Sequence, residues 1–279
     1  MTRSLPILSA VVLAALCPIG QAADVSTPLA GKPGVVAKTS VSVDVSDLWF
    51  NSAESGWGMQ LVQEGTFTFA TLFVYGTGSQ PTWATAQLSY VGGGVYTGPL
   101  YLTTGPYYGG AFDPSQVVIR QAGTMTFATS SIQAGTVTYS VDGVQVVKQV
   151  ERQTLVNEDY SGGYIATLNM MLTACTDPSR DGSGTSPLAM SITQTGTSMA
   201  MTWNFVDGSV CNYAGAYSQS GHIGEFTGSY TCSTGEAGAM HLFELTNRVG
   251  MVNGRIAGGS TNMGCQFTGR FTGLDPSAP

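Results

Sequence analysis

The chain has 279 residues, of which only 10% carry a charge, and its formal net charge is -7. Ordinary soluble domains contain about 25% charged residues, and surfaces that bind nucleic acid need clustered Lys and Arg. The composition therefore argues against nucleic acid and anionic membrane surfaces as partners, and its abundance of Gly, Thr, Ser and Val indicates an extracellular all-β protein.

The first 23 residues have the pattern of an export signal peptide. Arg3 supplies a positive charge, Leu5–Ile19 is apolar and lacks acidic residues, and Gly20–Ala23 offers small residues for cleavage. The apolar run is too short for a comfortable membrane span, and Leu16 precedes Cys17 where a lipoprotein needs a small residue. We therefore expect cleavage and release into the periplasm or the medium, with no membrane anchor.

Two breaks in composition divide the rest of the chain. Residues 24–43 mix Pro, Gly, Ser, Thr and Val without a pattern, which is typical of a linker. A second break falls at Asn157–Gly163. The sequence thus predicts an aromatic-rich β domain at 44–154 and a cysteine-bearing β domain at 158–274, each large enough for its own core.

Both domains consist of predicted strands separated by turn signals such as Asp142-Gly143. The short gaps indicate consecutive antiparallel hairpins. Such hairpins favour two up-and-down, calycin-like barrels or curled meanders in tandem, because closure limits free sheet edges. The predicted strands are 57–63, 67–75, 82–90, 95–102, 117–128, 135–141, 144–152, 163–172, 187–194, 198–205, 210–218, 223–232, 238–246, 251–258 and 264–272.

Short patterns recur between the two domains, either by chance or because both share one hairpin scaffold. In a repeated aromatic-Thr-Gly triplet the aromatic ring packs, Thr suits a strand, and Gly admits the close approach of a neighbouring strand. Met59, Gln63, Gly65 and Thr66 recur with the same spacing as Met190, Gln194, Gly196 and Thr197, and Tyr96-Thr97-Gly98 recurs as Phe226-Thr227-Gly228 and Phe267-Thr268-Gly269.

Four cysteines remain once the signal is removed, and an even number in an exported chain indicates two disulfides. Cys211 and Cys232 lie on adjacent predicted strands. Cys175 follows the first strand of its domain and Cys265 begins the last, and these strands are neighbours in a closed barrel. We therefore predict the pairs Cys211–Cys232 and Cys175–Cys265.

A catalytic constellation is not evident, so we predict a protein that is not an enzyme and needs no metal or cofactor. The sequence has no Gly-x-Ser-x-Gly elbow. A metal site can be drawn from His222, His241, Glu225 and Glu244, but its spacing matches no zinc signature. Glu54 stands among aromatic residues and lacks a turn role, yet a single carboxylate is not a glycosidase pair.

Aromatic side chains crowd the first hairpins and point to binding. The strand 67–75 carries Phe and Tyr on one face and Ala, Leu and Val on the other. One face lines the core, and the other meets a second domain, a partner or a ligand, unless the strand is simply central and covered. Loop tyrosines offer flat faces and hydroxyls to carbohydrate or peptide. The candidate ligand-binding residues are Trp49, Asn51, Glu54, Ser55, Trp57, Trp83, Tyr107 and Tyr108.

These residues also carry a resemblance. Leu48-Trp49-Phe50-Asn51 with Glu54-Ser55-Gly56-Trp57-Gly58 is similar to Leu-Trp-Trp-Asn-Pro-x-Glu-Ser-Gly-Trp-Gly, the opening of a secreted proteobacterial domain of uncharacterised function. The resemblance covers residues 47–153, with Ser52 in place of the proline and Phe50 in place of the second tryptophan. It implies an accessory or binding module and supplies no catalytic residues.

A second, weaker resemblance rests on Trp49, Asn51 and Ser55, whose spacing is similar to the opening of the avidin family. It implies an eight-stranded barrel in which Asn51 and Ser55 contact the ureido group of biotin. The paired Tyr and Ser of the next avidin strand, and the later tryptophans, have no counterpart here. The prediction we carry forward is an exported binding or accessory module for a small molecule, a glycan or a peptide, with a partner protein left open. The alternatives are a structural or adhesive surface protein, and a hydrolase that uses Glu54 or the two histidines.

Overall fold

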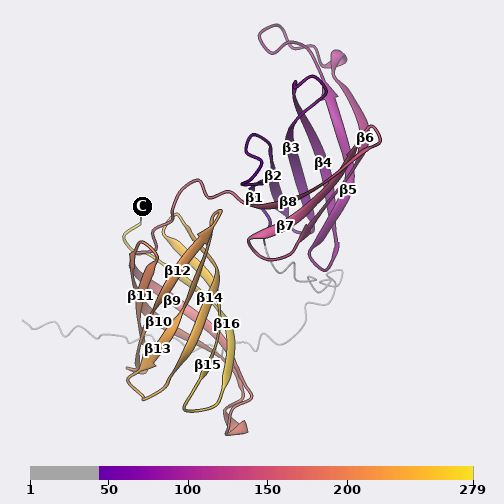
Figure 1. The fold of residues 1–279 in the computed structure, drawn as a ribbon. Helices are drawn as coiled ribbons and strands as arrows, with labels where there is room; N and C mark the ends of the chain where they lie inside the picture. The colour runs from indigo at the N-terminus through magenta and orange to yellow at the C-terminus, as the bar shows by residue number, and fades with distance from the viewer. Residues whose placement is uncertain (1–43, 279) are drawn as a thin grey trace, which may run out of the picture. The chain divides into compact units, whose positions relative to one another are not determined.

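A computed structural model describes residues 44–278, which form two closed antiparallel barrels of eight strands each (Figure 1). The predicted signal peptide and linker lie outside the described residues. No helix among residues 44–278 is long and apolar enough to cross a membrane. The prediction of tandem up-and-down barrels is confirmed.

The first barrel is closed by its shortest strand. β1 is only four residues long, and it pairs with β2 on one side and with β8 on the other. In the connection between β5 and β6, Asp113 caps the short 3-10 helix η1 (Pro114–Gln116). The strands are β1 (Asp47–Phe50), β2 (Gly58–Glu64), β3 (Phe67–Tyr75), β4 (Pro81–Gly92), β5 (Val95–Thr104), β6 (Val118–Thr129), β7 (Ala134–Val141) and β8 (Val144–Arg152).

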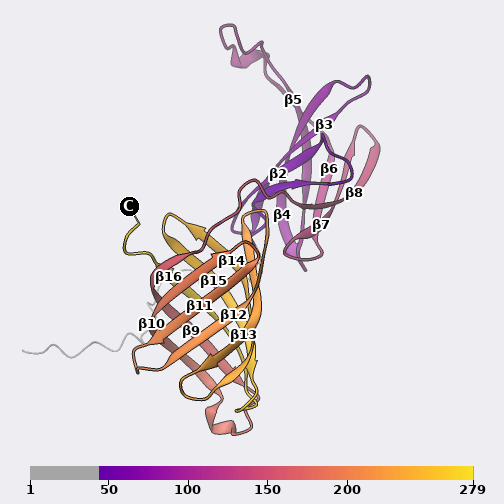
Figure 2. The same ribbon diagram turned by 60° about the vertical axis from the view of Figure 1, so that its left-hand side comes forward.

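The second barrel repeats this topology. β9 pairs with both β10 and β16, so the first and last strands of the domain close the sheet (Figure 2). The 3-10 helix η2 (Pro178–Arg180) lies between β9 and β10. The strands are β9 (Gly162–Thr173), β10 (Gly182–Thr195), β11 (Ser198–Phe205), β12 (Val210–Ser220), β13 (Ile223–Cys232), β14 (Ala237–Arg248), β15 (Met251–Ser260) and β16 (Gln266–Leu274).

The predicted strands differ from the observed ones in two places. β1 was not predicted, because four residues are too few to show an alternation. β10 begins at Gly182 rather than at 187, because its polar, glycine-containing start pairs with Asn169–Leu172 of β9. The predicted tight turn at Asp142-Gly143 is present, with φ values of 50° and 85° that match a type I′ hairpin.

The segment just before the first strand of each barrel is held by the same pattern of hydrogen bonds. In the first barrel Gln63 Oε1 accepts a hydrogen bond from the Val45 amide at 2.9 Å, and Trp49 Nε1 donates to the Val45 carbonyl at 3.0 Å. In the second barrel Gln194 Oε1 accepts from the Tyr160 amide at 3.1 Å, and the Tyr164 hydroxyl donates to the Tyr160 carbonyl at 2.9 Å.

Further contacts match as well. Ser46 Oγ accepts from the Gln63 amide, and Ser161 Oγ accepts from the Gln194 amide, each at 2.9 Å. Gln63 and Gln194 lie at the same point of β2 and β10, the second strand of each barrel. The shared contacts support a common scaffold over chance for the recurring sequence patterns.

The glycine of each repeated aromatic-Thr-Gly triplet allows a neighbouring strand to approach closely. A Cβ atom at Gly98 would collide with the carbonyl oxygen of Gln87, one at Gly228 with that of Ala214, and one at Gly269 with that of Asn169. Each obstacle is backbone of an adjacent strand, so no side chain can rotate away. The role predicted for these glycines is confirmed in all three copies.

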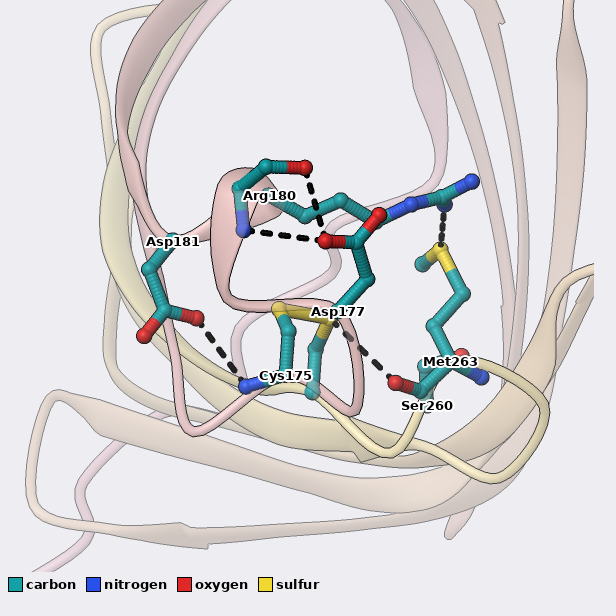
Figure 3. The surroundings of a disulfide bond; sticks show 8 residues. Cys175, Asp177, Arg180, Asp181, Ser260 and Met263 are labelled. Atoms are coloured by element: carbon teal, nitrogen blue, oxygen red, sulfur yellow. Dashed lines mark hydrogen bonds between the residues drawn. A yellow bond between two sulfur atoms is a disulfide. The ribbon is translucent and has the colours of Figure 1, made fainter.

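Both predicted disulfides are present and belong to the second barrel. Cys211–Cys232 joins directly opposed residues of β12 and β13. Cys175–Cys265 links the segment after β9 to the segment before β16 (Figure 3). Asp181 Oδ1 accepts a hydrogen bond from the Cys175 amide at 3.0 Å, which fixes the loop that carries η2. Two disulfides fit an exported protein.

Candidate functional site

The aromatic cluster of the first barrel is divided between the core and the surface. Trp49 is only 1% exposed, and its ring packs edge-on against Phe127 in the core. The Arg152 guanidinium lies over the indole at 4.7 Å and pairs with Asp47. Asn51 accepts a hydrogen bond from the Ala53 amide and donates to the Gln149 carbonyl, which stabilises the turn. These contacts give Trp49 and Asn51 structural partners.

Glu54 has side-chain partners that the sequence did not indicate. Lys148 Nζ lies 2.7–2.8 Å from the two carboxylate oxygens, and Trp57 Nε1 donates to Oε2 at 3.0 Å. The hydrogen bond from Lys148 lowers the pKa of the Glu54 carboxyl. Closure of the barrel brings Lys148 of β8 to the exposed turn that carries Glu54, so this carboxylate has an ammonium partner. An exposed, ionised carboxylate lacks the raised pKa of a general acid.

Four of the other candidates in the first barrel are exposed. Ser55 lies in the turn before β2 and Trp83 lies on the outer side of β4. Tyr107 and Tyr108 pack against each other at a tilt, with 4.8 Å between ring centroids, in the loop between β5 and β6. Trp57 is half-buried and packs against the core, and the loop tyrosines do not line the grooves beside Trp57 and Trp83. A ligand-binding role for these residues stays a prediction.

The candidate metal site composed of His222, His241, Glu225 and Glu244 is not formed in the structure. His241 Nε2 lies 3.9 Å from Glu225 Oε2, whereas Glu244 pairs with Arg255 at 3.0 Å and His222 occupies the turn between β12 and β13. Within residues 44–278 there is no group of three or more His, Cys, Asp or Glu side chains that could hold a metal ion.

The second barrel encloses a cavity of about 470 Å³ that the sequence did not indicate. All eight strands contribute to its wall, so the cavity is the interior of the barrel itself. Its volume lies within the range of about 300–1,000 Å³ that is typical of small-molecule sites. The apolar part of the wall includes Leu168, Met170, Trp203, Met240, Ile256 and Phe267.

The opposite end of the second barrel is packed. Tyr160 is fully buried, and its hydroxyl donates a hydrogen bond to the Leu245 carbonyl at 3.0 Å. The ring of Tyr217 lies beside it, with 5.6 Å between the centroids. Burial raises the pKa of the Tyr160 hydroxyl, which therefore stays protonated as a donor. Tyr160 and its neighbours thus form a floor, and the barrel has the shape of a cup.

A row of aromatic rings runs along β11, β12 and β13 and crosses the interior of this cup to β16. The Trp203 and Tyr213 centroids lie 4.7 Å apart, those of Tyr213 and Tyr230 5.7 Å apart, and those of Tyr230 and Phe267 5.9 Å apart. Burial raises the pKa of the Tyr213 hydroxyl, and the charged form of Tyr230 would raise it further. The tyrosines therefore stay neutral and can donate hydrogen bonds.

Trp203 is the wall residue that most requires explanation. It is 1% exposed, and among residues 44–278 no atom accepts a hydrogen bond from its Nε1. A buried donor without a partner costs about 1–3 kcal/mol, so most native structures avoid one. Nε1 itself has less than 1 Å² of accessible surface, so an acceptor in the cup could reach it only after the side chains around it move.

The mouth of the cup lies at the disulfide end of the barrel. Arg180, Asp207 and Glu236 line it, together with the disulfide Cys211–Cys232. The guanidinium of Arg180 lies against the sulfur of Met263 (Figure 3). Asp207 is held in its turn by Ser209, whose hydroxyl donates to Oδ1. Two acidic groups and one basic group leave the mouth with a net negative charge at neutral pH.

Comparison with known proteins gives little information about the function of these sites. No protein-family model matches the chain, and no curated protein matches it. The chain is similar in fold to a crystal structure described as a "putative outer membrane protein" from Bacteroides fragilis NCTC 9343, at 12% identity and a TM-score of 0.31. The match covers 82% of this chain and 95% of the other. A likeness this weak carries no inference about function.

Sequence reasoning missed the cup for a definite reason. Its wall residues alternate with outward-facing ones along ordinary strands, so they have the same pattern as a filled core. One available signal was the clustering of Met, Tyr and Trp at inward positions of the second domain, since flexible and amphipathic side chains suit binding walls.

Proposed function

We propose that the protein is an exported binding protein that holds a small, largely apolar molecule in the cup of the second barrel. The observation that carries this proposal is the cavity of about 470 Å³ inside the second barrel, whose wall is mostly apolar and aromatic. Export is supported by the two disulfides and by the leader-like pattern of residues 1–23.

The wall and the mouth restrict the chemistry of the ligand. Apolar and aromatic side chains favour a hydrophobic body, and the neutral hydroxyls of Tyr213 and Tyr230 suit an acceptor such as a carbonyl, ether or hydroxyl oxygen. Because Asp207 and Glu236 outnumber Arg180 at the mouth, a free carboxylate is disfavoured there. The proposed ligand is therefore uncharged or cationic rather than a fatty-acid anion.

The first experiment identifies bound material. Protein purified from the periplasm with both disulfides formed is extracted with organic solvent, and the extract is analysed by mass spectrometry. The same extraction from a Leu168→Trp variant, whose larger side chain would fill part of the cup, serves as the comparison. A molecule present with the natural protein and absent with the variant supports the proposal.

The second experiment measures binding directly. The uncharged dye N-phenyl-1-naphthylamine is titrated into the extracted protein, and a single saturable site is expected. The Leu168→Trp variant should lose binding, whereas Phe73→Ala on the first barrel should retain it. Absence of both a co-purified molecule and saturable dye binding in correctly disulfide-bonded protein would refute the proposal.

A further inference from the structure

The outer face of β2, β3 and β4 in the first barrel exposes aromatic rings. On β3, Ala70 and Leu72 point into the core, while Phe67, Phe69, Phe73 and Tyr75 point outward and are exposed. Monomeric proteins seldom leave a contiguous apolar patch on the surface unless it binds something. The alternative of a covered central strand is therefore wrong for β3.

The strand register places the largest of these rings side by side. Gly58 of β2 is opposite Phe73 of β3, and Phe73 is opposite Trp83 of β4. Neighbouring strands lie about 4.8 Å apart, and Trp57 immediately precedes Gly58. Phe73 and Trp83 thus lie side by side on the outer face, and the half-buried Trp57, which also packs against the core, lies just before β2 beside this pair.

Two shallow grooves meet at Phe73. One, of about 180 Å³, is lined by Phe73, Tyr75 and Trp83, and the other, of about 260 Å³, is lined by Phe73 and Trp57. Both include Gly56, so the grooves are continuous around Phe73. We call this continuous surface the aromatic track.

The strands of the track carry little charge. They contain a single charged residue, Glu64, at the end of β2. Beside Trp57 lies the ion pair of Glu54 and Lys148, whose charges cancel. Outward positions without rings hold amides and hydroxyls, including Gln60, Thr71, Thr85 and Gln87, and the apolar Val62. A surface of flat rings with neutral hydrogen-bonding groups is complementary to an uncharged polar molecule that also has flat apolar faces.

We propose that the aromatic track binds a neutral polysaccharide. A sugar ring has a C–H face that stacks on an aromatic side chain, and hydroxyls at its edge that suit Thr and Gln. A polymer can occupy successive rings of the track. An anionic membrane or an acidic polysaccharide needs Lys or Arg, and protein interfaces are enriched in Arg, none of which the three strands contain.

The test is a binding assay with the full, disulfide-bonded protein. Cellulose, chitin, starch and mannan are the neutral probes, and alginate and phosphatidylglycerol vesicles are the charged ones. The natural protein should bind at least one neutral probe and neither charged one. The double variant Phe73→Ala/Trp83→Ala should bind that probe at least about tenfold more weakly.

Matched controls separate this site from the loop tyrosines and from the cup. Tyr108→Ala removes a ring that is 93% exposed but lies outside the track, so it should leave polysaccharide binding unchanged. The track variant should still bind N-phenyl-1-naphthylamine, whereas Leu168→Trp should still bind the polysaccharide. The inference is overturned if no neutral probe is bound, if only a charged probe is bound, or if the track variant binds as well as the natural protein.

Discussion

The same substitution at two equally buried tryptophans should have opposite consequences. Trp49 and Trp203 are each 1% exposed, but Trp49 Nε1 donates to the Val45 carbonyl at 3.0 Å and Trp203 Nε1 has no partner within residues 44–278. Replacing either by Phe removes apolar area and leaves a small void, at a cost of about 1–2 kcal/mol.

The hydrogen bond decides the difference. Trp49→Phe also leaves the buried Val45 carbonyl without its donor, which adds about 1–3 kcal/mol. Trp203→Phe removes an unsatisfied donor and returns about 1–3 kcal/mol. The expected totals are a loss of about 2–5 kcal/mol at Trp49, and at Trp203 a change between a loss of about 1 kcal/mol and a gain of about 2 kcal/mol.

Differential scanning calorimetry measures both changes, because each barrel is large enough to unfold as its own transition. A difference of about 2 kcal/mol corresponds to roughly 8 °C or more in Tm for domains of this size. Equal shifts in the two variants, or a larger loss at Trp203, would show that Trp203 Nε1 is satisfied in the empty protein. Trp203 would then not carry the energetic cost of a buried donor without a partner.

Three further predictions concern stability. Arg152→Leu should destabilise the first barrel by about 3–5 kcal/mol in urea unfolding, because Arg152 is fully buried. Its loss removes the guanidinium partner of Asp47 and a donor to the carbonyls of Ser46 and Ile132. A loss below about 1 kcal/mol would contradict this. Replacing both Cys211 and Cys232 by Ser should lower the stability of the second barrel by about 3 kcal/mol. Replacing Cys175 and Cys265 should lower it by about 4.5 kcal/mol, because this pair closes the longer loop. In calorimetry the unfolding transition of the first barrel should not shift in either variant. Burial, followed by the negative charges of Tyr90 and Asp44, raises the pKa of Tyr96 from 10.0 to about 12. The protonated Tyr96 therefore contributes stability that is present below about pH 10 and is lost as the pH rises towards 12. The urea midpoint of the first barrel should fall over that range, and it should fall less in the Tyr96→Phe variant.

The sequence predicted the features that depend on local pattern and on topology. The cysteine pairs followed from the closure of an up-and-down sheet, and the role of Gly98 followed from the packing of neighbouring strands. The partner of Glu54 could not be predicted, because Lys148 is 94 residues away and becomes a neighbour only when β8 meets β1. Nor could the inward position of Trp49, since β1 is too short to show which of its side chains face the core.

The candidate site was predicted less completely from the sequence than the fold. The sequence identified the aromatic residues of the first domain, and the structure places Trp83 on the outer face and leaves Trp57 half-buried against the core. The sequence did not distinguish a filled barrel from a hollow one, because inward Met, Leu and Tyr residues occur in both kinds of barrel. Whether Trp203 has a hydrogen-bond partner depends on the atoms around it in three dimensions, and no spacing in the sequence reports that.

The closure of β9 against β16 has a consequence for how the protein is made. Cys175 enters the oxidising compartment first, and its partner Cys265 follows 90 residues later. Cys211 and Cys232 arrive between them, so an oxidase that joins cysteines in order of appearance would first make the wrong bond, from Cys175 to Cys211. Correct maturation therefore depends on a disulfide isomerase, and host strains that lack one should accumulate a mispaired second barrel beside a correctly folded first one.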